Sequence, residues 1–251
     1  MDKATIIEGA EPLYKHGNEV GILVLHGFTG TTQSVRPLAE VYDKAGYSVA
    51  MPCLEGHGTH FEEMEKKTYQ DWIASAEEAL EWLRKKDCKV LFIIGLSMGG
   101  TLALHLAERN RDVTGIALIN AAIELPDFEK LEGDDQPRFL DAIHSDIKRQ
   151  GVSELAYDQV PLVSVQELLK LMNEVRPALD NIHCPALLFV SDEDHVVPPD
   201  NSEFIFETVF SEHKELVHLE NSYHVATLDH DIDLIVERTL EFFQQYTEVK
   251  G

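Results

Sequence analysis

Short apolar runs alternate with longer segments of helical periodicity along most of this chain. In the helical segments the apolar residues recur every three or four positions, as on one face of a helix. The apolar runs that predict buried strands are 21–25, 47–51, 90–95, 115–119, 186–190 and 215–219. The segments that predict helices are 34–44, 69–85, 98–109 and 232–245. This alternation is typical of an α/β fold with a mostly parallel sheet and helices on both faces.

One stretch, residues 123–176, interrupts the alternation because it lacks a convincing core strand. Its helical patterns, 139–148 and 164–175, predict short helices instead. An insertion of this length between two strands is often a lid or cap over a site. We therefore expect a core formed by residues 1–122 and 177–251 and a small helical cap inserted after the sixth-strand region. A second helical layer without a substrate role is the alternative.

The turn Gly95-Leu96-Ser97-Met98-Gly99 lies between a predicted strand and a predicted helix. A G-x-S-x-G motif in this context forms a sharp turn that exposes one serine hydroxyl above the sheet. The flanking glycines leave room where a Cβ would collide with neighbouring backbone. Backbone N–H groups at the start of the helix favour negative charge. The motif predicts that Ser97 is a catalytic nucleophile.

A serine nucleophile requires a histidine base and a carboxylate that orients it. With this motif the chain order is serine, then acid, then histidine, and the acid follows a later strand. Asp192, Glu193 and Asp194 compete for that place. Asp194 is favoured because it begins the pattern Asp-x-x-Val-Pro, and Asp192 stays as the alternative.

The histidine should follow the last predicted strand. His224 lies in a loop at that place, whereas a single histidine among the 12 in the chain would carry little weight by itself. His195 is next to the favoured acid but inside its turn, which indicates a bystander. The order Ser97, Asp194, His224 therefore predicts the catalytic triad.

An oxyanion hole requires two N–H donors. One is the residue after the nucleophile, Met98, and the other comes from the loop after an early strand. That loop is His26-Gly27-Phe28-Thr29-Gly30, in which the N–H of Phe28 is the candidate. The alternative for this loop is an ordinary glycine-rich turn.

The sequence contains little that indicates a binding site for a metal or a cofactor. His57 and His60 have a spacing compatible with metal binding, but no third ligand cluster accompanies them, so a shaped loop is favoured. No phosphate-binding loop or dinucleotide motif is present, and we expect neither a metal nor an organic cofactor. The three cysteines are widely spaced and do not predict a disulfide framework.

The length and net charge of the chain limit the classes of molecule that it is expected to bind. The 251 residues carry a net charge of −24, which disfavours nucleic acids and anionic membranes. No apolar run has the length of about 20 residues that a membrane span needs, and the N-terminus does not read as a signal peptide. We expect a cytoplasmic protein with a small-molecule ester substrate and no stable membrane insertion; monomer and dimer stay open.

Several motifs together resemble the thermostable monoacylglycerol lipase and carboxylesterase group of Bacillus-type bacteria. They are His26–Gly30, Gly56–Thr59, Gly95–Gly99, Ser191–Pro199 and Asn221–Val225. The resemblance implies an α/β-hydrolase fold and hydrolysis of monoacylglycerols and other short- to medium-chain esters. It also implies that Ile143 and Glu154 lie near the alcohol or glycerol pocket. The alternatives are a general carboxylesterase, an acyltransferase or perhydrolase, and a non-enzymatic binder, which a complete triad disfavours.

Overall fold

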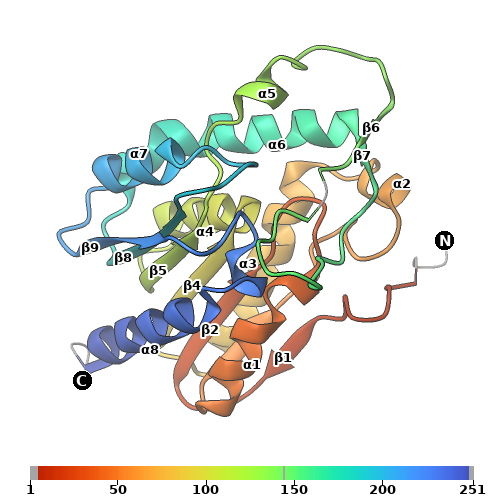
Figure 1. Ribbon diagram of the computed structural model, residues 1–251. Coiled ribbons are helices and arrows are strands. Elements are labelled where there is room, and N and C mark those ends of the chain that lie inside the picture. The colour runs from red at the N-terminus through yellow and green to blue at the C-terminus, as the bar shows by residue number, and fades with distance from the viewer. Residues whose placement is uncertain (1–4, 144, 249–251) are drawn as a thin grey trace.

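A central seven-stranded sheet organises the molecule (Figure 1). The structure is a computed structural model that describes residues 5–143 and 145–248. The strands of this sheet are β1 (Leu13–Lys15), β2 (Val20–Leu25), β3 (Ser48–Met51), β4 (Val90–Leu96), β5 (Val113–Ile119), β8 (Ala186–Ser191) and β9 (Lys214–Leu219). Their spatial order is β1-β3-β2-β4-β5-β8-β9. Only the edge pair β1–β3 is antiparallel; the other neighbours are parallel, which confirms the expected fold class.

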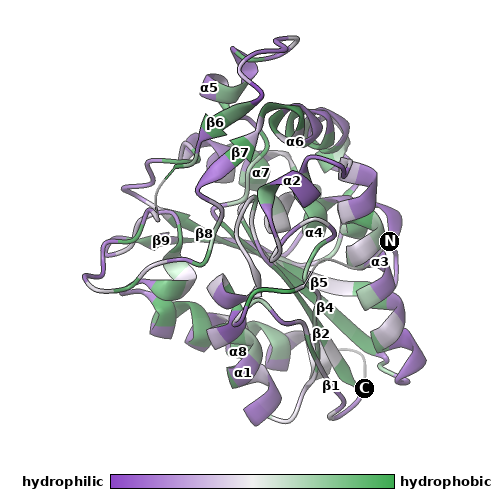
Figure 2. Cartoon of the chain, turned by 90° about the vertical axis from the view of Figure 1, so that its right-hand side faces the viewer, coloured by the Kyte–Doolittle hydropathy of each residue, from purple (hydrophilic) through white to green (hydrophobic). Residues whose placement is uncertain are grey.

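Helices cover both faces of this sheet (Figures 1 and 2). One face carries α1 (Arg36–Lys44) and α8 (Ile232–Glu248). The other carries α3 (Tyr69–Lys85), α4 (Met98–Arg109) and α7 (Asp200–Thr208). Two buried apolar clusters fill the spaces between sheet and helices, one on each face. Because helices cover both faces of such a sheet, a binding site forms among the loops that follow the carboxyl ends of the strands.

The strands serve both clusters because their side chains alternate in direction. In β2, Ile22 and Val24 join the cluster beneath α1 and α8, whereas Leu23 and Leu25 join the cluster beneath α3 and α4. All four are buried. A strand buried on both sides needs apolar residues at every position, which is the continuous apolar pattern seen in the sequence.

The sequence predicts the long elements better than the short ones. Helices α3 and α4 have the expected bounds of 69–85 and 98–109. Strand β1, helix α7 and the short helix α2 (Phe61–Met64) were not expected. Strand β1 is three residues long, and its side chains are exposed or only partly buried. It therefore has no apolar pattern in the sequence, and its pairing with β3 defines it.

The insertion begins after β5, which is the fifth strand along the chain, and ends before β8. It contains α5 (Pro126–Glu129), β6 (Phe139–Asp141), β7 (Gln159–Pro161), α6 (Leu162–Val175) and the 3-10 helix η2 (Arg176–Asn181). Helix α6 realises the expected helical pattern 164–175, and it packs against α4. Figure 1 places α5 and α6 above the sheet, on the side of α4.

The expected helix over 139–148 is wrong. Residues 139–141 form β6, which pairs antiparallel with β7, and the following described residues are irregular. Leu140 stands opposite Val160, and this cross-strand pair takes the place of a helical turn. The partner lies about 20 positions away along the chain, so local periodicity carried no sign of it.

Close backbone contacts fix the turn between β4 and α4. A Cβ added to Gly95 would lie 2.1 Å from the carbonyl oxygen of Gly99. A Cβ added to Gly99 would lie 2.3 Å from the carbonyl oxygen of Leu25 in β2. Real Cβ atoms do not approach backbone so closely, so both positions require glycine. The turn is therefore packed directly onto its own helix and onto the neighbouring strand.

We predict that Gly99→Ala destabilises the protein by at least about 3 kcal/mol, because rigid backbone rather than a mobile side chain opposes the new methyl group. Urea unfolding followed by circular dichroism measures this change. Gly133→Ala is the control: its φ of 83° is strained, but its Cβ meets nothing within 4 Å. The control should cost only about 1 to 2 kcal/mol. Equal losses in the two variants would contradict the packing argument.

Candidate active site

The main chain of Ser97 adopts an unusual conformation at the start of α4. Its φ of 56° and ψ of −121° lie outside the regions that non-glycine residues prefer. Its N–H donates to the carbonyl oxygen of Ile119 (2.9 Å), and its own carbonyl oxygen accepts from Gly100 (2.8 Å). The side chain is largely buried and lines a pocket. Such strain, held by surrounding hydrogen bonds, is frequent at functional sites.

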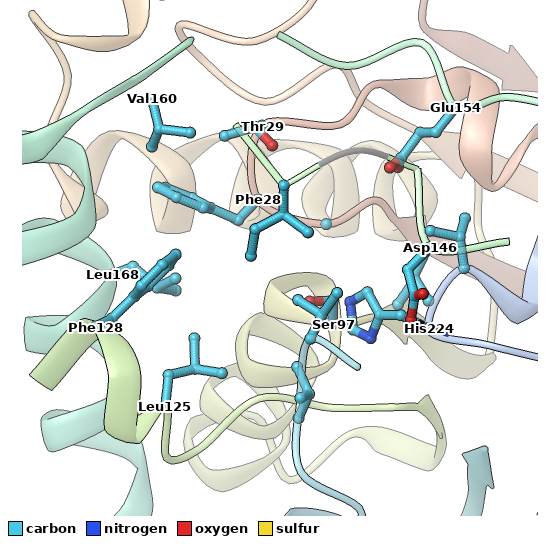
Figure 3. A pocket seen from close by; sticks show the side chains of 16 residues that line it. Phe28, Thr29, Ser97, Leu125, Phe128, Asp146, Glu154, Val160, Leu168 and His224 are labelled. Carbon is cyan, nitrogen blue, oxygen red and sulfur yellow. Dashed lines mark hydrogen bonds between the residues drawn. The ribbon is translucent and has the colours of Figure 1, made fainter. Parts of the chain in front are cut away.

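His224 lines the same pocket, and Figure 3 shows its imidazole ring beside Ser97. On the opposite side of the ring, Nδ1 lies 2.8 Å from Oδ2 of Asp194. The other oxygen of Asp194 accepts backbone N–H groups from Val196 and Val197, both at 2.8 Å. These bonds fix the carboxylate, which then orients the imidazole with its hydrogen on Nδ1 and leaves Nε2 able to accept a proton.

The two competing carboxylates point elsewhere. Asp192 pairs with His218 at the surface (2.7 Å), with both side chains about half exposed. Glu193 pairs with Lys148 (3.0 Å). The structure therefore brings Asp194, and neither competitor, to His224.

Charge around His224 favours its protonated form. Burial acts to lower the pKa of the imidazole, but the carboxylates of Asp194, Glu154 and Asp146 outweigh burial and raise the pKa above its ordinary value. A proton on this ring is thus stabilised by three carboxylates. An imidazole of this kind is neutral only above its raised pKa, and only the neutral ring could act as a base.

The loop after β2 lies directly against Ser97. A Cβ on Gly27 would stand 3.2 Å from the Cβ of Ser97, so the loop approaches this closely because residue 27 is glycine. Phe28 and Thr29 line the pocket next to it. The N–H of Met98 is at the first position of α4, where a helix amide has no intrahelical partner. Phe28 and Met98 thus both lie beside Ser97.

His26 holds this loop, a role that the sequence did not reveal. Its Nδ1 lies 3.0 Å from the carbonyl oxygen of Gly27, and its Nε2 accepts the N–H of Leu54 at 3.1 Å. Complete burial lowers the pKa of His26 to about 4. The ring is therefore neutral at pH 7, with its hydrogen on Nδ1, and ties the Phe28 loop to the loop after β3.

Asn120 holds the His224 loop in a similar way. Its side-chain Nδ2 donates to the carbonyl oxygen of His224 (2.8 Å) and to Oγ of Ser191 (2.9 Å). Its Oδ1 accepts the N–H of Ser191 (2.8 Å). The Ser191 hydroxyl in turn donates to the carbonyl oxygen of Tyr223 (2.9 Å). An asparagine at a strand end has no distinctive sequence signal, so these contacts emerge only from the fold.

The pocket above Ser97 has an apolar side and a polar side. The empty space in it, open solvent included, is about 660 Å³. Figure 3 shows the apolar side chains on one side of Ser97 and two carboxylates, Asp146 and Glu154, on the other. The labelled apolar residues are Phe28, Leu125, Phe128, Val160 and Leu168.

Ile143 and Glu154, expected near the alcohol pocket, both line this cavity. Ile143 is 54% exposed and stands at its rim. Burial raises the pKa of Glu154, against the opposing effects of His224 and the Ser34 hydroxyl. A Cβ on Gly30 would lie 2.5 Å from Oε1 of Glu154, so the insertion reaches the loop after β2 here.

His57 and His60 do not come together as ligands. His57 is buried, and its ring packs edge-on against His26 and Trp72. His60 is exposed, and its Nδ1 accepts the N–H of Glu62 at the start of α2. Within residues 5–143 and 145–248 there is no group of three or more histidine, cysteine or acidic side chains arranged to hold a metal ion.

Comparisons with known proteins bear on family and fold. A model of the alpha/beta hydrolase family matches residues 22–238. A protein named thermostable monoacylglycerol lipase, from Bacillus sp. (strain H-257), is 53% identical over 243 residues, which cover 96% of this chain and 97% of that one. A protein named carboxylesterase, from Bacillus subtilis (strain 168), is 26% identical over 249 residues, 94% of this chain and 96% of that one.

A solved structure described with two metagenome-derived lipolytic enzymes superimposes with a TM-score of 0.93 at 47% identity. The match covers 96% of this chain and all of that one. These similarities confirm the resemblance inferred from the motifs. Separately, no helix in the described part of the chain is both long and apolar enough to cross a membrane.

We predict that Asn120→Ala lowers kcat by about tenfold, because the His224 loop loses its anchor and small misplacements are costly. The change should also destabilise the fold by about 2 kcal/mol, since buried groups of Ser191 and His224 lose their partner. Ester hydrolysis and urea unfolding measure the two effects. Asn110→Ala, at the far end of α4, is the control and should keep kcat. An unchanged kcat in Asn120→Ala would refute the anchoring role.

Proposed function

We propose, since the chain belongs to the alpha/beta hydrolase family, that it hydrolyses carboxylic esters through an acyl-enzyme on Ser97. The observation that carries the proposal is the convergence of Ser97 and the hydrogen-bonded pair His224–Asp194 on one pocket. A nucleophile, a base and an orienting acid are the groups that acyl transfer needs.

In the first half-reaction the Oγ of Ser97 attacks the ester carbonyl carbon, and its proton passes to Nε2 of His224. The tetrahedral intermediate collapses as the carbon–oxygen bond breaks. His224 gives the proton to the departing alcohol, and the acyl group stays on Ser97. Asp194 stabilises the imidazolium that forms in between.

In the second half-reaction His224 takes a proton from water, whose oxygen attacks the acyl-enzyme. The carboxylic acid leaves, and Ser97 regains its proton. The N–H groups of Phe28 and Met98 are proposed to bind the oxyanion in both steps. Each donor of this kind contributes on the order of 100-fold to 1,000-fold in rate.

The preferred substrate is proposed to be a monoacylglycerol. The apolar side of the pocket suits one acyl chain, and the carboxylate of Glu154 on the other side suits the hydroxyls of glycerol. Ile143 is proposed to contact the same alcohol group. The 53% identity to the Bacillus monoacylglycerol lipase supports this choice, whereas the relative named carboxylesterase keeps a general esterase as the second candidate.

Residues 123–176 are proposed to act as a cap on a core of residues 1–122 and 177–251. The cap contributes Leu125, Phe128, Val160 and Leu168 to the wall opposite Ser97. Acyl transfer to an alcohol or peroxide would use the same acyl-enzyme, and product analysis with these acceptors separates it from hydrolysis. A cytoplasmic location stays a prediction, supported by Cys53, Cys88 and Cys184 as free thiols.

We predict that Ser97→Ala abolishes hydrolysis of a p-nitrophenyl ester and labelling by a fluorophosphonate probe, since both need the Oγ nucleophile. Circular dichroism should show an unaltered fold. Ser211→Ala, between α7 and β9, is the matched control and should keep both activities. Turnover by Ser97→Ala at the wild-type rate would disprove the assignment.

We predict that Glu154→Gln raises KM for a monoacylglycerol by about tenfold, the effect expected when a carboxylate acceptor for hydroxyl groups is weakened. KM for the methyl ester of the same fatty acid should change little, because methanol has no further hydroxyl. The comparison is made on the alkaline plateau, where the influence of Glu154 on the pKa of His224 no longer matters. Equal changes for both esters would contradict recognition of the glycerol group by Glu154.

A further inference from the structure

Asp146, in the insertion between β6 and β7, contacts both loops that carry the catalytic pair. Its Oδ2 accepts the N–H of His224 at 3.0 Å and the N–H of His195 at 3.1 Å. Its Oδ1 lies 2.9 Å from Nδ1 of His195, and its backbone carbonyl oxygen accepts the N–H of Val225 at 3.1 Å. The side chain is only 13% exposed. One carboxylate thus bridges the turn after Asp194 and the loop of His224.

A second buried carboxylate supports the same junction from the core side. Asp229 accepts the N–H groups of Lys148 (2.6 Å) and Arg149 (2.9 Å) from the insertion. It also accepts the N–H of Tyr223 (3.0 Å), next to His224. The segment that carries Asp146 is therefore fastened to the His224 loop at two points.

We propose that Asp146 is a positioning residue for the reaction, which holds the His224 loop against the Asp194 turn and couples both to the insertion. The inference rests on the ester hydrolysis proposed above. His195, expected to be a bystander in the reaction, supplies two of the contacts that join Asp146 to the turn after Asp194.

The carboxylate of Asp146 also acts through its charge. It is one of three acidic groups that favour the imidazolium form of His224, with Asp194 from the acid turn and Glu154 from the insertion. His195, 59% exposed, is the titratable group that faces Asp146 itself. Removal of the Asp146 charge should lower the pKa of His224. The acidic limb of the pH–rate profile, where the base becomes protonated, should then move to lower pH.

Two substitutions separate position from charge. Asp146→Asn keeps one oxygen, which can accept both backbone N–H groups, but removes the charge. Asp146→Ala removes both. On the alkaline plateau we expect Asp146→Ala to lose about 10-fold to 100-fold in kcat with little change in KM, the scale of effect of a misplaced base. Asp146→Asn should retain most of kcat, and both variants should shift the acidic limb of kcat/KM to lower pH.

The experiment measures kcat and KM for a soluble p-nitrophenyl ester across pH, together with an NMR titration of the His224 ring. Asp158→Asn, an exposed aspartate of the same insertion, is the matched control and should change neither quantity. Wild-type kcat and a wild-type pH profile in Asp146→Ala would overturn the proposal. Equal losses in both variants, with the pKa of His224 unmoved, would also overturn it, because Asp146 would then serve only the fold.

The titration keeps this test separate from the proposed function. If the wild-type protein hydrolyses no ester, the proposed function fails. The pKa of His224 in Asp146→Asn still reports on Asp146: a lowered value supports its action on the ring, and an unmoved value overturns it.

Discussion

The turn between β4 and α4 leaves no room for a side chain at either glycine. Positions 95 and 99 lie against backbone of the turn itself and of β2, so the chain reverses direction within a few residues. Ser97, at the apex, is forced into a strained conformation and points its side chain into the pocket. The same contact with β2 brings the loop of Phe28 beside Ser97. Ser97 and the candidate oxyanion donors are therefore positioned by the same close packing.

A histidine near that turn is useful only if it is held at the correct distance and angle. His224 is in a loop, and loops are the least rigid parts of a fold. Here Asn120 binds its carbonyl oxygen, Asp146 binds its N–H, and Asp194 binds its ring. These partners come from the end of β5, from the insertion and from the turn after β8. The site is thus fixed by buried polar bonds between segments that are distant in sequence.

The insertion therefore contributes in two ways: its apolar side chains line the pocket, and its carboxylates act on His224. Leu125 and Val160 shape the apolar side of the pocket, whereas Asp146 and Glu154 set the charge around His224. The carboxylates raise the pKa of the His224 imidazole, which makes the neutral ring a stronger proton acceptor. The same effect requires a higher pH for the base to be neutral.

The sequence predicted the elements and residues whose signals are local. Continuous apolar runs indicated β2, β4 and β5, and the glycine spacing around Ser97 indicated the turn. Asp194 and His224 were selected because each follows the end of a predicted strand, in the order that the motif requires. This information was sufficient to identify two residues that the fold places together. Their catalytic roles stay predictions that the geometry supports.

What the sequence could not predict depends on contacts between distant segments. Strand β6 pairs with β7 across an irregular loop, so its helical pattern misled the prediction. His26, Asn120 and Asp146 act through hydrogen bonds to main-chain atoms, and a main-chain partner leaves no trace in residue identity. The contact of His195 with the insertion, through Oδ1 of Asp146, was also not predicted, because the two residues are distant in sequence.

The most direct test is a crystal structure of the protein after reaction with a long-chain alkyl phosphonate that carries a p-nitrophenolate leaving group. We expect a covalent bond between phosphorus and Oγ of Ser97, formed as p-nitrophenolate departs. The phosphonyl oxygen should lie within hydrogen-bond distance of the N–H groups of Phe28 and Met98, and the alkyl chain should lie along Phe128 and Leu168. An unmodified Ser97, or a phosphonate bound to a different residue, would contradict this expectation.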